Sequence, residues 1–209
     1  AGQALARHKD VAKIAFTGSG PVGKLMMQYA AESNMKQVAL ELGGKSPQVV
    51  LDDVVDIDKA ASTIAWGIFY NAGQTCNAGS RVVVHEKVKD ALFERISAFV
   101  RDFRVGHPLD PNTQMGPLVS LKQRNRVCNY LDLVGQQGER FIFGGQKPTG
   151  NDCLIQPTLI DGAKHDSKLA QEEIFGPVIV AETFKSDEEA LALANGTEYG
   201  LAASVWSGN

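Results

Sequence analysis

The chain has 209 residues, of which 44% are hydrophobic, so it can bury a substantial core as one large domain or as parts of two. Its formal net charge of −3 leaves no broad basic surface for phosphate backbones, so no nucleic acid partner is expected and a small molecule is the default ligand. Three widely spaced cysteines, Cys76, Cys128 and Cys153, favour a reducing compartment over a disulfide framework and predict a cytoplasmic location.

The first elements form a βαβ pattern. Residues 13–17 (KIAFT) predict a strand, residues 22–32 a helix, and residues 37–41 (QVALE) and 48–51 two further strands. The chain therefore begins in the manner of an α/β protein.

The alternation continues through the middle of the chain. Asp56 is predicted to cap a helix that runs to about Tyr70, because its carboxylate can accept from free backbone amides, and Gly73 is placed to end that helix. Residues 81–85 (RVVVH) predict a strand, and residues 87–103 predict an amphipathic helix.

The last third of the chain follows the same scheme. It predicts a helix over 120–134, extended stretches over 140–144 and 154–160, a strand over 178–184, a short helix over 187–194 and a final apolar strand over 201–206. This order predicts an α/β protein with parallel strands.

An uncharged run from Ala60 to Ser80 raises the question of a transmembrane segment. Its second half contains Asn71, Gln74 and Asn77 and is too polar to cross a bilayer, so a buried helix followed by a loop is predicted and no membrane association is expected. The chain opens without an initiator Met or a signal peptide and stops just after an apolar strand, so we expect it to be a piece of a larger protein.

The first candidate site is GSGPVG, residues 18–23, between a predicted strand and a predicted helix. The pattern matches G-x-G-x-x-G, in which glycines let the backbone approach a pyrophosphate at a helix N-terminus. Two features count against a standard Rossmann fingerprint. Pro21 removes one amide donor, and Glu41, the acidic residue about 20 positions on, could have a role other than binding a ribose. A tight glycine turn without a ligand remains the alternative.

Two further motifs place reactive side chains beside glycines. In LELGGKSP, residues 40–47, Glu41 stands at the end of a strand, where α/β folds expose catalytic groups; the alternative is a surface Glu before a turn. In GQTCNAGSR, residues 73–81, small neighbours of Cys76 leave room for a substrate and for amides that bind an oxyanion; the alternative is a small buried hydrophobe.

A fourth motif, QEEIFGPV at residues 171–178, is by itself consistent with a charged turn that enters a strand. Metal binding is not predicted, because no histidine has a Cys or His partner at ligand spacing. The histidines are interpreted as ordinary surface or strand-end residues: His8, His85, His107 and His165.

Taken in order, FTGSGPVG, LELGGKSP, GQTCNAGSR, QEEIFGPV and EYGLAA resemble the NAD(P)-dependent aldehyde dehydrogenase superfamily over essentially the whole chain. The resemblance implies an aldehyde dehydrogenase-like α/β fold, with a Rossmann-type portion of the cofactor domain over residues 1–43 and an α/β catalytic domain, incomplete at its C-terminal end, over residues 44–209. It also implies that NAD or NADP is the cofactor.

The resemblance assigns roles residue by residue. Cys76 matches the family nucleophile and Glu41 its general base. Gly18, Ser19 and Gly23 match the loop and helix start beside the cofactor pyrophosphate. The backbone of Leu42 matches a position near the nicotinamide ring, and Glu173 and Phe175 match residues that contact the ribose next to the nicotinamide. We interpret four other motif residues as structural: Lys45, Asn71, Gln74 and Arg81.

The implied reaction oxidises an aldehyde to a carboxylic acid through a thioester on Cys76, which water activated by Glu41 then hydrolyses. A CoA-acylating semialdehyde dehydrogenase and a catalytically silent structural or binding member are the alternatives, and the presence of both Cys76 and Glu41 disfavours them. A cofactor-free thiol hydrolase would need a histidine partner that no motif marks. The resemblance also implies a homodimeric or homotetrameric parent protein, and the 209-residue chain alone is expected to be inactive.

Overall fold

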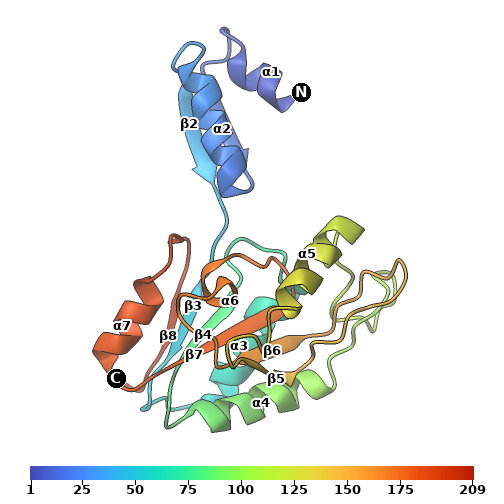
Figure 1. Cartoon of the computed structure of the whole chain (residues 1–209), viewed down its shortest axis with the longest axis vertical. Coiled ribbons are helices and arrows are strands. Elements are labelled where there is room, and N and C mark those ends of the chain that lie inside the picture. The colour runs from blue at the N-terminus through green and yellow to red at the C-terminus, as the bar shows by residue number, and fades with distance from the viewer. The chain divides into compact units, whose positions relative to one another are not determined.

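The structure is a computed structural model that describes all 209 residues. It divides into two compact units, Ala1–Gly43 and Gly44–Asn209, whose elements are labelled in Figure 1. The domain assignment expected from the sequence, a cofactor-domain portion over residues 1–43 and a catalytic domain over residues 44–209, remains a prediction. Each unit is described by itself below.

The first unit is built on one βαβ crossover. Strands β1 (Lys13–Thr17) and β2 (Gln37–Glu41) pair in parallel and coincide with the predicted strands, and helix α2 (Gly20–Ala31) connects them. Helix α2 begins two residues before the predicted start because Pro21 is tolerated in a first helical turn, where its missing amide is not needed. A short helix, α1 (Gly2–Arg7), was not predicted.

The core of this unit is small. Ala6, Ile14 and Met26 are buried together, one from each of α1, β1 and α2. The amine of Lys36 donates to the carbonyl of Ala6 at 2.7 Å, which ties the start of β2 to α1. The apolar stripe of α2 is thereby held against the sheet.

The second unit contains a six-stranded sheet in the order β5-β6-β7-β4-β3-β8 (Figure 1). Its strands are β3 (Pro47–Val50), β4 (Arg81–His85), β5 (Arg140–Phe143), β6 (Thr158–Asp161), β7 (Val178–Phe184) and β8 (Ser204–Trp206). All neighbours run parallel except β5 and β6, so the prediction of parallel strands is wrong for that pair. No helix separates β5 from β6, whereas parallel neighbours are usually joined by a crossover helix.

Helices cover both faces of this sheet. They are α3 (Ile57–Phe69), α4 (Lys89–Arg101), α5 (Leu121–Leu131), the one-turn α6 (Lys168–Gln171), which was not predicted, and α7 (Asp187–Asn195). Val82 and Val84 of β4 pack into the core that contains α3 and α4, whereas Val83 packs with Ala190 of α7. The strand is apolar at consecutive positions because both of its faces are buried.

Side-chain caps define where several helices start. The carboxylate of Asp56 accepts from the amide of Lys59 at 2.9 Å, as predicted, and the hydroxyl of Ser120 accepts from the amide of Gln123 at 3.2 Å. Helix α5 therefore starts just after Ser120 and ends three residues before the predicted end at Val134. None of the helices combines the length and the apolar character that crossing a bilayer requires.

The turn after α3 departs from the prediction. The helix ends at Phe69, and Asn71, Ala72 and Gly73 all have positive φ, at 51°, 53° and 69°. Gly73 is therefore the third left-handed residue of a tight turn rather than the residue that stops the helix. At this position a Cβ atom would also overlap the carbonyl of Gly176, so the turn packs directly on the chain that precedes β7.

Gly73→Ala is expected to destabilise the second unit by about 3 kcal/mol or more, because it combines a left-handed backbone with overpacking against Gly176. Gly150→Ala is the matched control: Gly150 has a φ of 59° and open space around it, so only the backbone penalty of about 1 kcal/mol applies. Urea unfolding of both variants measures the difference. Equal losses in the two variants would show that the contact with Gly176 is unimportant.

Candidate functional site

Two predicted cofactor residues lie between β1 and α2. Ser19 is the N-cap of α2, but its hydroxyl makes no capping hydrogen bond. The amide of Gly18 donates to the carbonyl of Glu41 at 3.0 Å, which continues the pairing of the two strands. The first turn of this 12-residue helix thus presents free amides and the positive end of the helix dipole, an arrangement that favours an anion.

The other predicted residues of the first unit lie at the end of β2. Glu41 is its last residue, pairs with Thr17 and is exposed. Gly23 is buried in α2, and a Cβ added there would come within 2.8 Å of the Leu42 side chain. The helix therefore packs closely on the residue that follows Glu41. Gly18, Ser19, Gly23, Glu41 and Leu42 belong to the first unit, and Cys76, Glu173 and Phe175 to the second.

Cys76 lies in the loop that joins the left-handed turn to β4, and it is partly buried. Its amide donates no hydrogen bond within the protein. The loop is braced by Gln74, whose amide donates to the carbonyl of Asn71 at 3.1 Å and whose side-chain oxygen accepts from the amide of Val119 at 2.9 Å. A thiol beside a free amide is the arrangement that a nucleophile with an oxyanion site requires.

A cavity of about 410 Å³ lies next to this loop. Thr75 and Asn77, the two chain neighbours of Cys76, line it, and Trp66 and Tyr70 of the α3 region form an aromatic wall with ring centroids 6.3 Å apart. Its volume lies in the range of small-molecule sites. Ser46 also lines it, and the buried hydroxyl of this residue has no hydrogen-bond partner in the protein.

Gly44 brings three of the sequence motifs together. A Cβ at Gly44 would overlap the carbonyl oxygen of Cys76, so only glycine allows this approach of the two backbones. The amide of Gly44 donates to Oε1 of Glu173 at 3.0 Å. The sequence predicts no contact for this glycine, and its place directly after Glu41-Leu42-Gly43 is the signal that points to it.

The segment with Glu173 and Phe175 is held from α5. Phe175 has a φ of 59°, a strained value for an aromatic residue. The side-chain amide of Gln123 donates to the carbonyls of Ile174 and Phe175 at 3.1 and 2.7 Å, and Arg126 donates to the carbonyl of Glu173 at 2.7 Å. Sequence reasoning missed Gln123 and Arg126, because α5 is about 50 residues away along the chain and carries no recognisable motif.

The neighbouring carboxylate, Glu172, accepts a hydrogen bond from the hydroxyl of Tyr130 at 2.7 Å. Burial, together with this hydrogen bond, raises the pKa of Tyr130 to about 12. The phenol therefore stays protonated and keeps its donor role at neutral pH.

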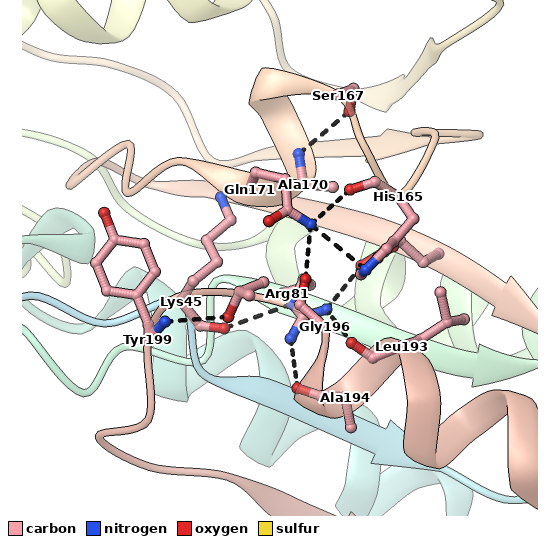
Figure 2. A network of polar contacts seen from close by, with 12 residues as sticks. Lys45, Arg81, His165, Ser167, Ala170, Gln171, Leu193, Ala194, Gly196 and Tyr199 are labelled. Carbon is pink, nitrogen blue, oxygen red and sulfur yellow. Dashed lines mark hydrogen bonds and ion pairs between the residues drawn. The ribbon is translucent and has the colours of Figure 1, made fainter.

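A buried polar network surrounds Arg81, the first residue of β4 (Figure 2). The fully buried guanidinium of Arg81 donates to Glu182 at 3.1 Å and to the carbonyls of Leu193 and Ala194 at 2.6 and 2.8 Å. Glu182 also pairs with Nδ1 of His165 at 2.7 Å, so His165 is more than the ordinary surface or strand-end residue that we expected. The structural interpretation of Arg81 fits these contacts.

Lys45 belongs to the same region and is 1% exposed. Its amine has no hydrogen-bond partner in the protein. Burial, together with the nearby charge of Arg81, lowers the pKa of Lys45 from its ordinary 10.5 to about 7, against the opposing effect of three carboxylates. No three His, Cys, Asp or Glu side chains in the structure gather in a way that could hold a metal ion.

The chain is similar to known proteins over its whole length. The sequence profile of the "Aldehyde dehydrogenase family" matches residues 1–209. The chain belongs to the aldehyde dehydrogenase family. It is 47% identical over 209 residues to an aminoacetaldehyde dehydrogenase of Pseudomonas aeruginosa, covering 100% of this chain and 42% of that protein.

Solved structures of aldehyde dehydrogenases share the fold. The crystal structure of a gamma-glutamyl-gamma-aminobutyraldehyde dehydrogenase from Burkholderia cenocepacia matches with a TM-score of 0.94 and 49% identity. An indole-3-acetaldehyde dehydrogenase of P. syringae, in a complex with NAD+, matches with a TM-score of 0.96 and 43% identity. Each match covers 100% of this chain and 42% of the other. The aldehyde dehydrogenase chain described here thus spans about two fifths of the length of these relatives.

The buried lysine of this aldehyde dehydrogenase chain makes stability depend on pH. Between about pH 7 and the ordinary pKa of 10.5, the unfolded chain binds a proton at Lys45 that the folded chain does not. The free energy of unfolding therefore rises with pH in that window, and below about pH 7 it does not change with pH on account of Lys45. Lys45→Met removes the cost of burying the amine. It is expected to raise the free energy of unfolding at pH 7 by about 3 kcal/mol, a gain that shrinks towards about pH 10.

Urea unfolding at several pH values measures this effect, and Lys89→Met is the control, because the Lys89 amine is partly exposed and pairs with Asp161. A lower stability of Lys45→Met at every pH would show that the amine makes a favourable interaction in the folded chain.

Proposed function

We propose that the whole protein containing these 209 residues oxidises an aldehyde to a carboxylic acid, with NAD+ or NADP+ as the hydride acceptor. The observation that carries this proposal is a partly buried Cys76 with a free amide, in a loop whose residues Thr75 and Asn77 line a cavity of about 410 Å³, in a member of the aldehyde dehydrogenase family. An aldehyde panel assayed for NADH and NADPH formation tests it. The panel should include aminoacetaldehyde, indole-3-acetaldehyde and gamma-glutamyl-gamma-aminobutyraldehyde, the compounds named in three relatives.

The residues present fit a nicotinamide dinucleotide. Gly18, Ser19 and Gly23 surround the start of α2, where free amides suit a pyrophosphate. Oε1 of Glu173 is held by Gly44, while its second oxygen has no protein partner and is available to ribose hydroxyls. Phe175 and the backbone at Leu42 complete the proposed contacts. When bound, the cofactor supplies the acceptor for the hydride that leaves the substrate carbon.

The proposed first step belongs to Cys76. Its thiolate adds to the aldehyde carbon, and the amide of Cys76 binds the oxyanion that forms. Loss of hydride from that carbon leaves an acyl group attached to Cys76 as a thioester. The rigid turn before Cys76, braced by Gln74, keeps the sulfur in one orientation for both events.

The proposed second step belongs to Glu41. Its carboxylate takes a proton from a water molecule that attacks the thioester, which releases the carboxylic acid and restores Cys76. The side chain of Glu41 is exposed at the end of β2 and makes no hydrogen bond within the protein, so it is free to act as a base.

The alternatives make different demands. A CoA-acylating enzyme would transfer the acyl group to a thiol and would not need a base at Glu41. A silent structural member would show no turnover with any aldehyde.

For the assembly we propose a homodimer or homotetramer, and for the location the cytoplasm. Native mass measurement tests the assembly, and imaging of a tagged protein tests the location.

Cys76→Ala is expected to abolish aldehyde oxidation by the whole protein while leaving the affinity for NAD+ nearly unchanged, because hydride leaves only from a carbon bonded to sulfur. Turnover should fall below about a hundredth of the wild-type value. Cys128→Ala, at another partly buried cysteine of the same unit, is the control and should remain active. Substantial turnover in the Cys76 variant would remove it from the mechanism.

Glu41→Gln is expected to slow steady-state turnover by about two orders of magnitude or more, the usual scale for a lost general base. On rapid mixing, up to one equivalent of reduced cofactor per site should form and be followed by a nearly flat phase, while mass spectrometry detects the acyl group on Cys76. Glu32→Gln, at an exposed ion pair of the same unit, is the control. A burst that disappears without a trapped thioester would assign Glu41 to activation of the thiol instead.

A further inference from the structure

The segment of residues 172–175, which carries Glu173 and Phe175, has a backbone conformation that needs outside support. Phe175 has a φ of 59°, in the left-handed region that an aromatic residue rarely occupies. Such a conformation persists only where surrounding groups enforce it, and strained residues of this kind are concentrated at functional sites. The groups that hold Phe175 therefore determine the shape of the segment that carries Glu173.

One face of α5 holds this segment. Residues 123, 126 and 130 lie three and four positions apart, so their side chains project from the same side of the helix. Their contacts follow the segment in order: the hydroxyl of Tyr130 donates to Glu172 at 2.7 Å, Arg126 to the carbonyl of Glu173 at 2.7 Å, and the side-chain amide of Gln123 to the carbonyls of Ile174 and Phe175. The segment is thus bound by α5 at each of its four residues.

Of these three side chains, Gln123 is the one that contacts the strained residue. Its side-chain nitrogen lies 3.1 Å from the carbonyl oxygen of Ile174 and 2.7 Å from that of Phe175. These two carbonyls belong to the peptide groups before and after Phe175, and φ and ψ of Phe175 set the relative orientation of those two planar groups. By binding both carbonyls, one side-chain amide fixes the left-handed conformation. Carbonyl oxygens only accept hydrogen bonds, so the group that holds them must be a donor.

By its position in the sequence, Gln123 would have a local role at the start of α5. It follows the N-cap residue Ser120 by three positions, the spacing of a capping box, in which a Gln or Glu side chain accepts from the amide of the N-cap residue. The hydroxyl of Ser120 accepts from the amide of Gln123 at 3.2 Å, but the return bond does not form, and the side chain of Gln123 donates to the 172–175 segment instead. The two roles differ in chemistry, because a glutamate serves a capping box but cannot donate to carbonyls.

We propose that Gln123 is a positioning residue for the cofactor: its side-chain amide holds the left-handed backbone of Phe175 and thereby fixes the directions from which Phe175 and Glu173 meet the ribose. The inference rests on the proposed function, in which these two residues contact the ribose next to the nicotinamide. Without the two hydrogen bonds, Phe175 relaxes out of the left-handed region and the cofactor binds more weakly, while the chemistry at Cys76 is unaffected.

The first test measures the binding of NAD+ and of NADP+ to the whole protein by calorimetry, without aldehyde. Gln123→Met removes the donor without adding a charge and is expected to raise Kd about tenfold, the scale of one or two lost hydrogen bonds. Gln123→Glu should weaken binding at least as much, although a glutamate suits a capping box. Gln123→Lys keeps a donor and should bind the cofactor more tightly than Gln123→Glu, whereas a role in stabilising the start of the helix would produce the opposite order.

Gln136→Met is the matched control. The side-chain amide of Gln136 also donates to a backbone carbonyl, that of Asp132 at 2.9 Å just beyond the end of α5, and not to the 172–175 segment. Its Kd should equal that of the wild type. Urea unfolding of each variant verifies that it is folded under the binding conditions.

The second test separates binding from chemistry. In Gln123→Met, KM for the cofactor should rise about tenfold, while kcat at saturating cofactor should stay within about threefold of the wild type. A crystal structure of the whole Gln123→Met protein should show Phe175 with a negative φ. A left-handed Phe175 in that structure would overturn the inference, as would a fall in kcat with an unchanged KM.

The outcomes distinguish this inference from the proposed function. An unchanged Kd in Gln123→Met, in a protein that oxidises aldehydes, overturns the positioning role alone. Binding that is weaker in Gln123→Lys than in Gln123→Glu overturns it as well, because that order belongs to a helix cap. Weakened cofactor binding by Gln123→Met in a protein that oxidises no aldehyde would support the positioning role and refute the proposed function. A whole protein that binds neither NAD+ nor NADP+ would refute both.

Discussion

The guanidinium of Arg81 is the interaction on which the second unit depends. It is fully buried and donates to Glu182 of β7, to two carbonyls at the end of α7 and to the carbonyl of Lys45 before β3. Arginine suits this position because its planar group offers five donors in fixed directions. One side chain at the start of β4 thereby fixes elements more than 100 residues apart in the sequence.

The same anchoring positions the proposed site. Arg81 ends the GQTCNAGSR motif, so the loop with Cys76 enters β4 at the residue that makes these contacts. Gly44, one residue before Lys45, then contacts the backbone of Cys76 and binds the carboxylate of Glu173. The proposed nucleophile and the proposed ribose-binding carboxylate are therefore held by a single short segment.

Several groups close to the proposed site are buried without a hydrogen-bond partner or have a strained backbone. The amine of Lys45 and the hydroxyl of Ser46 are buried without partners, and Phe175 holds a positive φ under the clamp of Gln123. Such features lower stability wherever they occur. Lys45 and Ser46 follow Gly44 directly and Phe175 follows Glu173 by two residues, so these groups adjoin the residues of the proposed site.

The sequence by itself determined most of the elements and the family of this protein. The strands at 13–17, 37–41, 81–85 and 178–184 and the cap at Asp56 follow from apolar patterning and local hydrogen bonding, which act over a few residues. Only the tertiary structure decided the antiparallel pairing of β5 with β6, the left-handed turn at Asn71 and Ala72, and the contacts that Gly44, Gln123 and Arg126 make with the Glu173 segment. Each of these depends on groups that lie far apart in the chain, and their free energy comes from burial and from hydrogen bonds that exist only once the sheet has assembled.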